Sequence, residues 1–325
     1  MKAITNVISK SNLKFVYLEL TVRCNLSCEF CDKDMKNSYK DIATLQFEEI
    51  VDQLLSETKL CLHGIGEPTM HKDLSRFIHY AKSKNLYVYF NTNFTLVSEL
   101  QMQEFVSSKL DELRISLSAG ERGSYKNYSG RDLFDNLLVN IQQMIKIRGT
   151  SKFPLVRVVF VLTSENIFEL EKVAKICDEL GVDELMIQNM QNWGNTTNTH
   201  KIKNGVFISN IDNKERKKIF QSLKQIVKHT KIITPDIISD EEIKKGQCQW
   251  PFNAIWITAN GYITPCCNMH NYNEINFGTA FSNDIYSLWL SESYKNFRID
   301  YLLDKVNACQ TCPMHYGNFK TYKYK

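Results

Sequence analysis

The sequence lacks the features that would assign it to several common classes of protein. Its longest apolar run, residues 153–162, is interrupted by Arg157 and is too short to cross a bilayer. The N-terminus, residues 1–14, has no apolar core and is therefore not a secretory signal. The net charge of +4 is too small to indicate nucleic acid by itself, and there is no internal repeat or low-complexity block. What remains is an ordinary globular composition, long enough at 325 residues for one large domain and a smaller one.

Cysteine residues, by contrast, are plentiful. Ten of them in a chain without an export signal argue against a disulfide scaffold and for metal or redox chemistry in a reducing cytoplasm. Cys24, Cys28 and Cys31 lie so close in sequence that one loop can place three thiolates around a single iron–sulfur cube. Such a cube keeps one iron open for chemistry. A zinc loop is the alternative, but structural zinc usually has four closed ligands, and the fourth is missing locally.

Apolar periodicity predicts strands alternating with helices between residues 14 and 187. This alternation is typical of βαβ units and a parallel sheet, so we expect an α/β fold. Polar and glycine-rich residues follow the strands, which indicates a site at the C-terminal edge of the sheet. The predicted strands are residues 14–20, 59–62, 86–90, 113–117, 155–162 and 184–187, and the predicted helices are residues 45–56, 74–83, 97–107, 132–147 and 167–180.

The first cysteine cluster resembles the loop of a known family. It reads Cys-x3-Cys-x-aromatic-Cys with Phe30 at the aromatic position, and this pattern resembles the radical S-adenosylmethionine (SAM) enzymes. Residues 64–68, Gly-Ile-Gly-Glu-Pro, resemble the family's Gly-Gly-Glu-Pro segment after the second strand, although the isoleucine departs from it. The resemblance covers most of the chain and implies a partial (βα)6 TIM-like barrel over about residues 15–191.

The resemblance also implies where SAM binds. Glycines let the backbone approach the methionine end of SAM and offer bare amide and carbonyl groups to its ammonium, while Glu67 adds negative charge. Polar residues after the later strands are further candidates, although helix capping and turn formation also explain them. The candidate cofactor-binding residues are Phe30, Gly64, Gly66, Glu67, Asn93, Ser116, Ser118 and Gln188.

A second set of cysteines lies near the C-terminus: Cys248, Cys266, Cys309 and Cys312. Residues 254–258 and 262–264 are predicted to form a hairpin around Ala-Asn-Gly, which brings the first two of these cysteines together. By spacing alone the four thiols fit either zinc or a fully ligated [4Fe–4S] cluster. The arrangement resembles the SPASM/twitch extension of some radical SAM enzymes, in its shorter form with one auxiliary [4Fe–4S] cluster.

We divide the chain into an N-terminal segment (1–13), a radical SAM barrel (14–200), a helical linker (201–245) and an auxiliary cluster domain (246–325). Three cysteines are left over. Cys61 and Cys177 fit core positions, whereas Cys267 adjoins the auxiliary set. Cys267 is either a thiol that donates a hydrogen atom to a substrate radical or a neighbour of a ligand that only packs.

The resemblance implies a cytoplasmic radical SAM oxidoreductase. The first cluster, reduced by a one-electron donor such as flavodoxin or ferredoxin, cleaves SAM to a 5′-deoxyadenosyl radical that abstracts a substrate hydrogen. With the auxiliary cluster as electron acceptor, we expect dehydrogenation of a small polar or sugar-like substrate. Because the first strand begins near residue 14, we expect no leader-binding domain before it, and a peptide substrate would need a separate recognition protein.

The alternatives are a peptide-modifying enzyme that makes thioether or carbon–carbon links or epimerises residues, and a redox-neutral epimerase that uses Cys267. A non-catalytic zinc module is a further alternative, but it does not explain the Gly-Ile-Gly-Glu-Pro segment. An RNA modifier is supported only by the basic, aromatic tail at residues 316–325, so neither a nucleic acid nor a membrane is an expected partner.

Overall fold

A computed structural model describes residues 8–29, 31, 40–190, 213–235, 248–310 and 312. Within these residues, one sheet runs in the order β7-β6-β5-β4-β3-β2-β1-β8-β9, and every neighbouring pair is parallel except β8 and β9. The strands are β1 (Phe15–Leu18), β2 (Lys59–Cys61), β3 (Tyr87–Thr92), β4 (Glu112–Ser116), β5 (Leu155–Leu162), β6 (Glu184–Asn189), β7 (Lys231–Ile233), β8 (Ala254–Ile257) and β9 (Ile263–Thr264).

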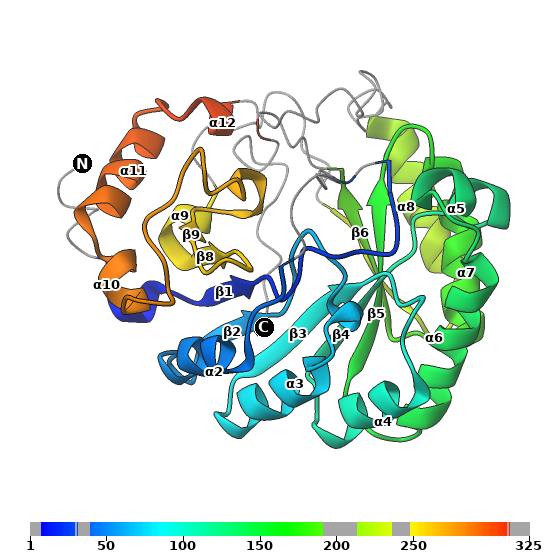
Figure 1. Cartoon of the computed structure of the whole chain (residues 1–325). Coiled ribbons are helices and arrows are strands. Elements are labelled where there is room, and N and C mark those ends of the chain that lie inside the picture. The colour runs from blue at the N-terminus through cyan, green and yellow to red at the C-terminus, as the bar shows by residue number, and fades with distance from the viewer. Residues whose placement is uncertain are drawn as a thin grey trace.

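The six predicted strands are confirmed as β1 to β6, and the helices between them cover the outer face of the sheet (Figure 1). Among the helices that lie between these strands, α5 was not predicted from the sequence. The helices of the first part are α2 (Thr44–Asp52), α3 (Leu74–Ser83), α4 (Glu99–Ser107), α5 (Arg122–Ser129), α6 (Phe134–Arg148) and α7 (Leu170–Leu180), and those of the second are α8 (Asn213–Ile226), α9 (Trp250–Asn253), α10 (Ile285–Trp289), α11 (Glu292–Leu302) and α12 (Asn307–Gln310). Among the described helices, none is long and apolar enough to cross a membrane.

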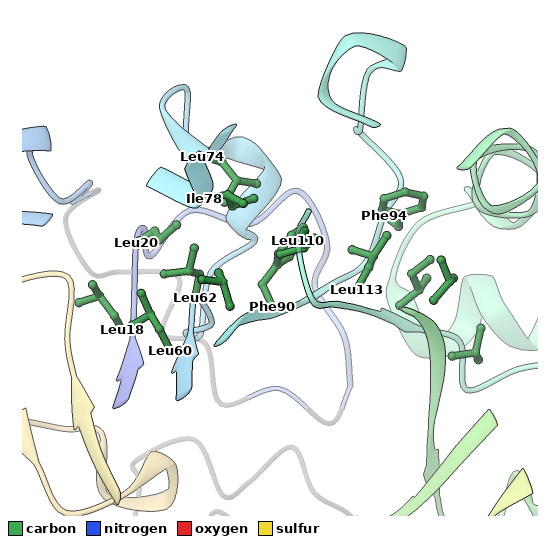
Figure 2. Packing of buried hydrophobic residues seen from close by; sticks show 14 of the residues in the cluster. Leu18, Leu20, Leu60, Leu62, Leu74, Ile78, Phe90, Phe94, Leu110 and Leu113 are labelled. Atoms are coloured by element: carbon green, nitrogen blue, oxygen red, sulfur yellow. The ribbon is translucent and has the colours of Figure 1, made fainter. Parts of the chain in front are cut away.

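Alternation along β1 sorts its side chains between two environments. Leu18 and Leu20 lie on the outer face and pack with leucines of β2 against Leu74 and Ile78 of α3, as Figure 2 shows. Tyr17 lies on the inner face and stacks on Trp250, with ring centroids 4.5 Å apart. The outer face therefore holds the apolar core, and the inner face is left for aromatic and polar groups that can form a site.

The C-terminal region is joined to the barrel through the sheet itself. The predicted hairpin is confirmed as β8 and β9, and β8 pairs in parallel with β1 over its full length. In addition, the Leu55 amide donates to the Tyr286 hydroxyl (3.0 Å), and the Ile285 amide donates to Gln53 Oε1 (2.7 Å). Figure 1 shows α9 to α12 gathered around β8 and β9, on the same side of the molecule as β1. The second cysteine set thus lies next to the first strand of the barrel.

The region predicted as a helical linker contains more than a helix. Helix α8 is present there, but the segment that follows it forms β7, which pairs in parallel with β6. Asp178 of α7 fixes the turn between them, because its carboxylate accepts hydrogen bonds from three successive backbone amides, those of Lys228, His229 and Thr230. This stretch therefore extends the sheet at the edge opposite to β8.

Candidate active site

The first cysteine loop follows β1 and is held by α5, the helix that the sequence did not predict. The last carbonyl groups of a helix have no partner within the helix. Here two of them accept hydrogen bonds from the loop, since the Ser27 amide donates to the Ser129 carbonyl (3.1 Å) and the Glu29 amide donates to the Tyr128 carbonyl (2.9 Å). Gly130 ends the helix with a φ of 74°, a left-handed conformation that glycine adopts readily. The end of α5 thus fixes the backbone between the first and third thiols.

The start of the loop is fixed by a partly buried hydrogen-bond network around Asp41. Arg23 donates to the Asp41 carboxylate (2.6 Å) and to the Met70 carbonyl (2.9 Å), and the Thr21 hydroxyl donates to the other carboxylate oxygen (2.6 Å). These hydrogen bonds hold the pKa of Asp41 below its ordinary value, although partial burial opposes the shift. Because Met70 follows β2, this network ties the cysteine loop to the next βα unit.

The three thiols are half-buried and act on one another electrostatically. Burial, and after it the neighbouring Cys31 and Cys24, raise the pKa of Cys28 to about 12. Three thiolates in such a place repel one another unless a cation lies among them, and iron of a cluster meets that requirement. The Asn93 amide nitrogen lies 3.9 Å from the Cys24 sulfur. Phe30, the predicted aromatic contact, lies outside the described residues.

The glycines after β2 are required by close packing. A Cβ atom on Gly66 would lie 2.1 Å from the Thr21 carbonyl oxygen and 2.7 Å from that of Arg23, both on the backbone that leads into the cysteine loop. A Cβ on Gly64 would lie 2.2 Å from the side chain of Glu19. The predicted glycine segment therefore contacts the backbone that leads into the cysteine loop directly.

Glu67, a predicted SAM contact, also has a place in the hydrogen bonding of the scaffold. Its buried carboxylate accepts hydrogen bonds from the hydroxyls of Thr69 (2.7 Å) and Thr92 (2.6 Å) and from the amides of Thr69 (3.0 Å) and Asn93 (2.7 Å). Burial raises its pKa, and these donors oppose the shift. A carboxylate has about four acceptor positions, so little of its capacity is left for a ligand. Its main contribution in this geometry is to join the glycine segment to the end of β3.

The remaining predicted SAM contacts fall into two groups. Ser118 is buried and accepts a hydrogen bond from the Val161 amide (2.9 Å), so its hydroxyl is used between β4 and β5. Ser116 and Gln188 are half-buried at or near the C-terminal ends of β4 and β6, on the edge where the cysteine loop lies. The geometry therefore leaves Ser116 and Gln188 as candidates to face a ligand, and gives Ser118 an internal partner.

Sequence reasoning missed Glu19, the buried residue that follows β1. Its Oε1 accepts from the Ile65 amide (2.8 Å) in the glycine segment, and its Oε2 accepts from the Ala259 amide (3.1 Å) in the β8–β9 turn. Burial raises the pKa of Glu19, while the two backbone donors and His270 lower it. Glu19 could have been recognised from the sequence as a carboxylate at an inward position of an otherwise apolar strand.

The second thiol set surrounds one small hollow that is partly open to solvent. Burial first, and the neighbouring thiols after it, raise the pKa of Cys266 well above its ordinary value. The Asn268 side chain donates to the Cys312 sulfur (3.2 Å). The hollow is lined by Cys248, Trp250, Pro251, Pro265, Cys266, Cys267, Asn268, Met269, Tyr301, Ala308, Cys309 and Cys312. The structure thus brings together all four predicted thiols, and Cys267 with them.

Neither set is arranged around one ion. In the part of the chain that the structure describes, no group of three His, Cys, Asp or Glu side chains converges closely enough to hold a single metal. Thiols spread around a hollow suit a larger group such as a cluster. The other two cysteines, Cys61 and Cys177, are buried, as predicted.

Comparison with known proteins agrees with this geometry. A family model of the radical SAM superfamily matches residues 18–187. The chain belongs to this superfamily. A second model, the SPASM iron–sulfur cluster-binding domain, matches residues 248–313, which contain the second thiol set. This radical SAM enzyme therefore uses SAM, a [4Fe–4S] cluster that binds it and an auxiliary cluster.

Two curated relatives are similar over most of their length. One, from Pyrococcus furiosus, is described as a tungsten-containing aldehyde ferredoxin oxidoreductase cofactor-modifying protein; it is 26% identical over 91% of this chain and 87% of its own. The other is the PqqA peptide cyclase of Bradyrhizobium diazoefficiens, 23% identical over 93% of this chain and 80% of its own. Streptococcus suis SuiB bound to the precursor peptide SuiA has the same fold, with a TM-score of 0.74, 17% identity and coverage of 97% of this chain and 72% of its own.

Proposed function

We propose that the chain catalyses a net two-electron oxidation, with Cys24, Cys28 and Cys31 holding the SAM-binding cluster and Cys248, Cys266, Cys309 and Cys312 holding the auxiliary one. When bound, SAM and the first cluster supply a 5′-deoxyadenosyl radical that takes a substrate hydrogen, and the auxiliary cluster supplies a place for one further electron. A one-electron reductant such as flavodoxin or ferredoxin starts each turnover.

The observation that carries this proposal is the meeting of four well-spaced thiols at one hollow. Four thiolates can fill every iron of a cube, and a fully ligated cube stores or passes electrons rather than binding a substrate. The donor set fits the group, since the thiols are half-buried and Asn268 donates a hydrogen bond to Cys312.

The barrel residues have the task of binding and orienting SAM. The glycine segment lies against the cysteine loop because Gly66 has no side chain, and we assign the backbone carbonyls of residues 64–66 to the ammonium of SAM. Ser116 and Gln188 lie on the same edge of the sheet and are the polar side chains that we assign to SAM. Glu67, Asn93 and Ser118 support these groups through the hydrogen bonds described above.

The substrate that we put first is a small polar or sugar-like molecule whose hydroxyl group is oxidised. The inner face of the barrel is aromatic beside β1, where Tyr17 stacks on Trp250 and its ring centroid lies 6.1 Å from that of Trp256. Such walls suit a compact ring. A peptide is the second candidate, favoured by the descriptions of the PqqA cyclase and of SuiB bound to SuiA.

A mass measurement in D2O separates these reactions from epimerisation. The reconstituted enzyme is incubated with SAM, dithionite and either a panel of amino and deoxy sugars or the short peptides encoded beside its gene. Two-electron oxidation gives a product lighter by two hydrogen atoms. Epimerisation, for which Cys267 would donate the hydrogen atom, gives a product that gains one deuterium, and that result would replace the oxidation that we propose.

A further inference from the structure

Glu19 is the residue through which the two halves of the site are connected. It lies directly after β1, the strand that pairs with β2 of the barrel on one side and β8 of the C-terminal region on the other (Figure 1). Only 4% of Glu19 is exposed. Each carboxylate oxygen accepts one backbone amide, from Ile65 on the barrel side and from Ala259 on the C-terminal side.

Both amides belong to segments that reach the proposed cofactor sites. Ile65 stands between the two glycines that we assign to SAM. Ala259 stands in the turn of the β8–β9 hairpin, and the chain continues from this hairpin into Cys266 and Cys267. His270 acts electrostatically on Glu19, and its Nδ1 donates a hydrogen bond to the Cys267 carbonyl (3.0 Å). The carboxylate therefore lies between the SAM segment and the auxiliary thiols.

The packing leaves this connection little freedom. The side chain of Glu19 fills the space beside Gly64, because a Cβ atom on Gly64 would lie 2.2 Å from Glu19 Cγ. The Glu19 amide also donates to the Ile257 carbonyl of β8 (2.9 Å). A buried amide is costly to leave without an acceptor. If the Ile65 backbone shifts, the Glu19 carboxylate must therefore move with it, and this movement changes the hydrogen bond to the Ala259 amide.

We propose that Glu19 is a positioning residue that couples the SAM segment to the auxiliary hairpin, so that SAM binding changes the midpoint potential of the auxiliary cluster. The inference rests on the assignment of the two thiol sets given above. Coupling of binding equilibria is reciprocal, so the oxidation state of the auxiliary cluster changes the affinity for SAM by the corresponding factor.

Two variants interrupt the connection at different points. Glu19→Gln keeps the shape but has only one acceptor oxygen, so its amide group faces one of the two backbone donors. Ala259→Pro removes the amide on the auxiliary side alone. Proline fits the second position of a turn, and the Gly261 amide bonded to the Thr258 carbonyl (2.7 Å) places Ala259 there. Asp178→Asn is the matched control, because Asp178 also accepts backbone amides but lies on α7, which carries no proposed ligand.

The experiment uses the reconstituted holoenzyme and measures iron content, SAM affinity and the midpoint potential of the auxiliary cluster, by redox titration followed by electron paramagnetic resonance, with and without SAM. We expect SAM to shift the midpoint in the wild type and in Asp178→Asn, and not in Glu19→Gln or Ala259→Pro. Glu19→Gln should also weaken SAM binding about tenfold, because the Ile65 amide loses a charged acceptor, whereas Ala259→Pro should keep the wild-type affinity.

A SAM-dependent shift of equal size in all four proteins overturns the coupling, and so does its absence from the wild type. If Glu19→Gln fails to load its clusters, the test rests on the midpoint shift of Ala259→Pro alone, since this variant retains the Glu19 carboxylate. The iron content of the wild type distinguishes a failure of the coupling from a failure of the proposed function. About four irons in the wild type, instead of about eight, overturns the auxiliary site and the coupling with it.

Discussion

The two thiol sites are built in opposite ways. The first is a single loop whose three cysteines are close in sequence. Its backbone amides donate hydrogen bonds to carbonyls at the end of α5, and the Arg23–Asp41 network fixes its start. The second is assembled from three separate segments around a hollow, with Cys248 before α9, Cys266 after β9, and Cys309 and Cys312 in and after α12. A local loop can leave one iron open, whereas an assembled set closes every position. The construction of each site thus matches the chemistry that we assign to it.

The largest effect is expected from removing one thiol of each site. Cys28→Ser should lower reductive cleavage of SAM by more than about 100-fold. Mutating even a residue that only orients a metal ligand lowers metal affinity or activity by about 10- to 100-fold. Cys309→Ser should keep SAM cleavage and lose the oxidised product. The measurement is 5′-deoxyadenosine and product formation by chromatography. Equal loss of SAM cleavage in both variants would contradict the separation of roles.

A smaller effect is expected where the glycine segment meets the cysteine loop. Gly66→Ala should destabilise the protein by about 1–3 kcal/mol and weaken SAM binding, because the new Cβ overlaps the Thr21 and Arg23 carbonyls. Gly123→Ala on α5 is the control, since nothing lies within 4 Å of a Cβ there, and it should stabilise by about 0.4–1 kcal/mol. Thermal melting and equilibrium SAM binding give the two quantities. Unchanged SAM affinity in Gly66→Ala would show that the glycine segment does not contact the ligand.

The hydrogen bonds of Glu67 allow a test of its supporting role. Glu67→Gln should cost about 1–3 kcal/mol of stability, because its amide group then faces the Asn93 amide or the threonine donors. Glu49→Gln, at an exposed position of α2, should change stability by less than about 0.5 kcal/mol. If denaturant titration finds the two variants equally stable, the carboxylate does not join these strands.

His63, beside the glycine segment, gives the smallest effect, and it depends on pH. Burial, and after it Arg114, lower the pKa of His63 to about 4. The unfolded chain binds a proton near pH 6.5 and the folded protein does not, so stability falls as pH drops below 6.5. Between pH 7.5 and 5.5 the wild type should lose about 1 kcal/mol more than His63→Gln. Parallel pH dependences of thermal melting in the two proteins would count against a neutral, buried imidazole.

The parts of this account that the sequence predicted are those carried by contiguous residues. The six strands, the cysteine loop and the glycine segment each have a local pattern, and the structure places them side by side. Helix α5 was missed because its residues are mostly polar; only Tyr125 and Tyr128, three apart and followed by Gly130, indicate it. The role of Glu19 was missed because it depends on β8 pairing with β1, a contact between residues more than two hundred positions apart.

The roles of individual polar residues were the least predictable. Glu67 and Ser118 were predicted as SAM contacts, and the structure adds that both use side-chain oxygens to join neighbouring strands. A polar residue after a parallel strand can serve the ligand or the scaffold, and only the positions of its donors and acceptors distinguish the two.

The central claim is that the chain carries two clusters on two separate thiol sets. Iron and sulfide content after anaerobic reconstitution tests it most directly, for the wild type and for the Cys24/Cys28/Cys31→Ala variant. The account predicts about eight irons per chain in the wild type and about four in the variant. About four in the wild type and none in the variant, with zinc bound at the C-terminal thiols, would contradict it and would leave the oxidation without an electron acceptor.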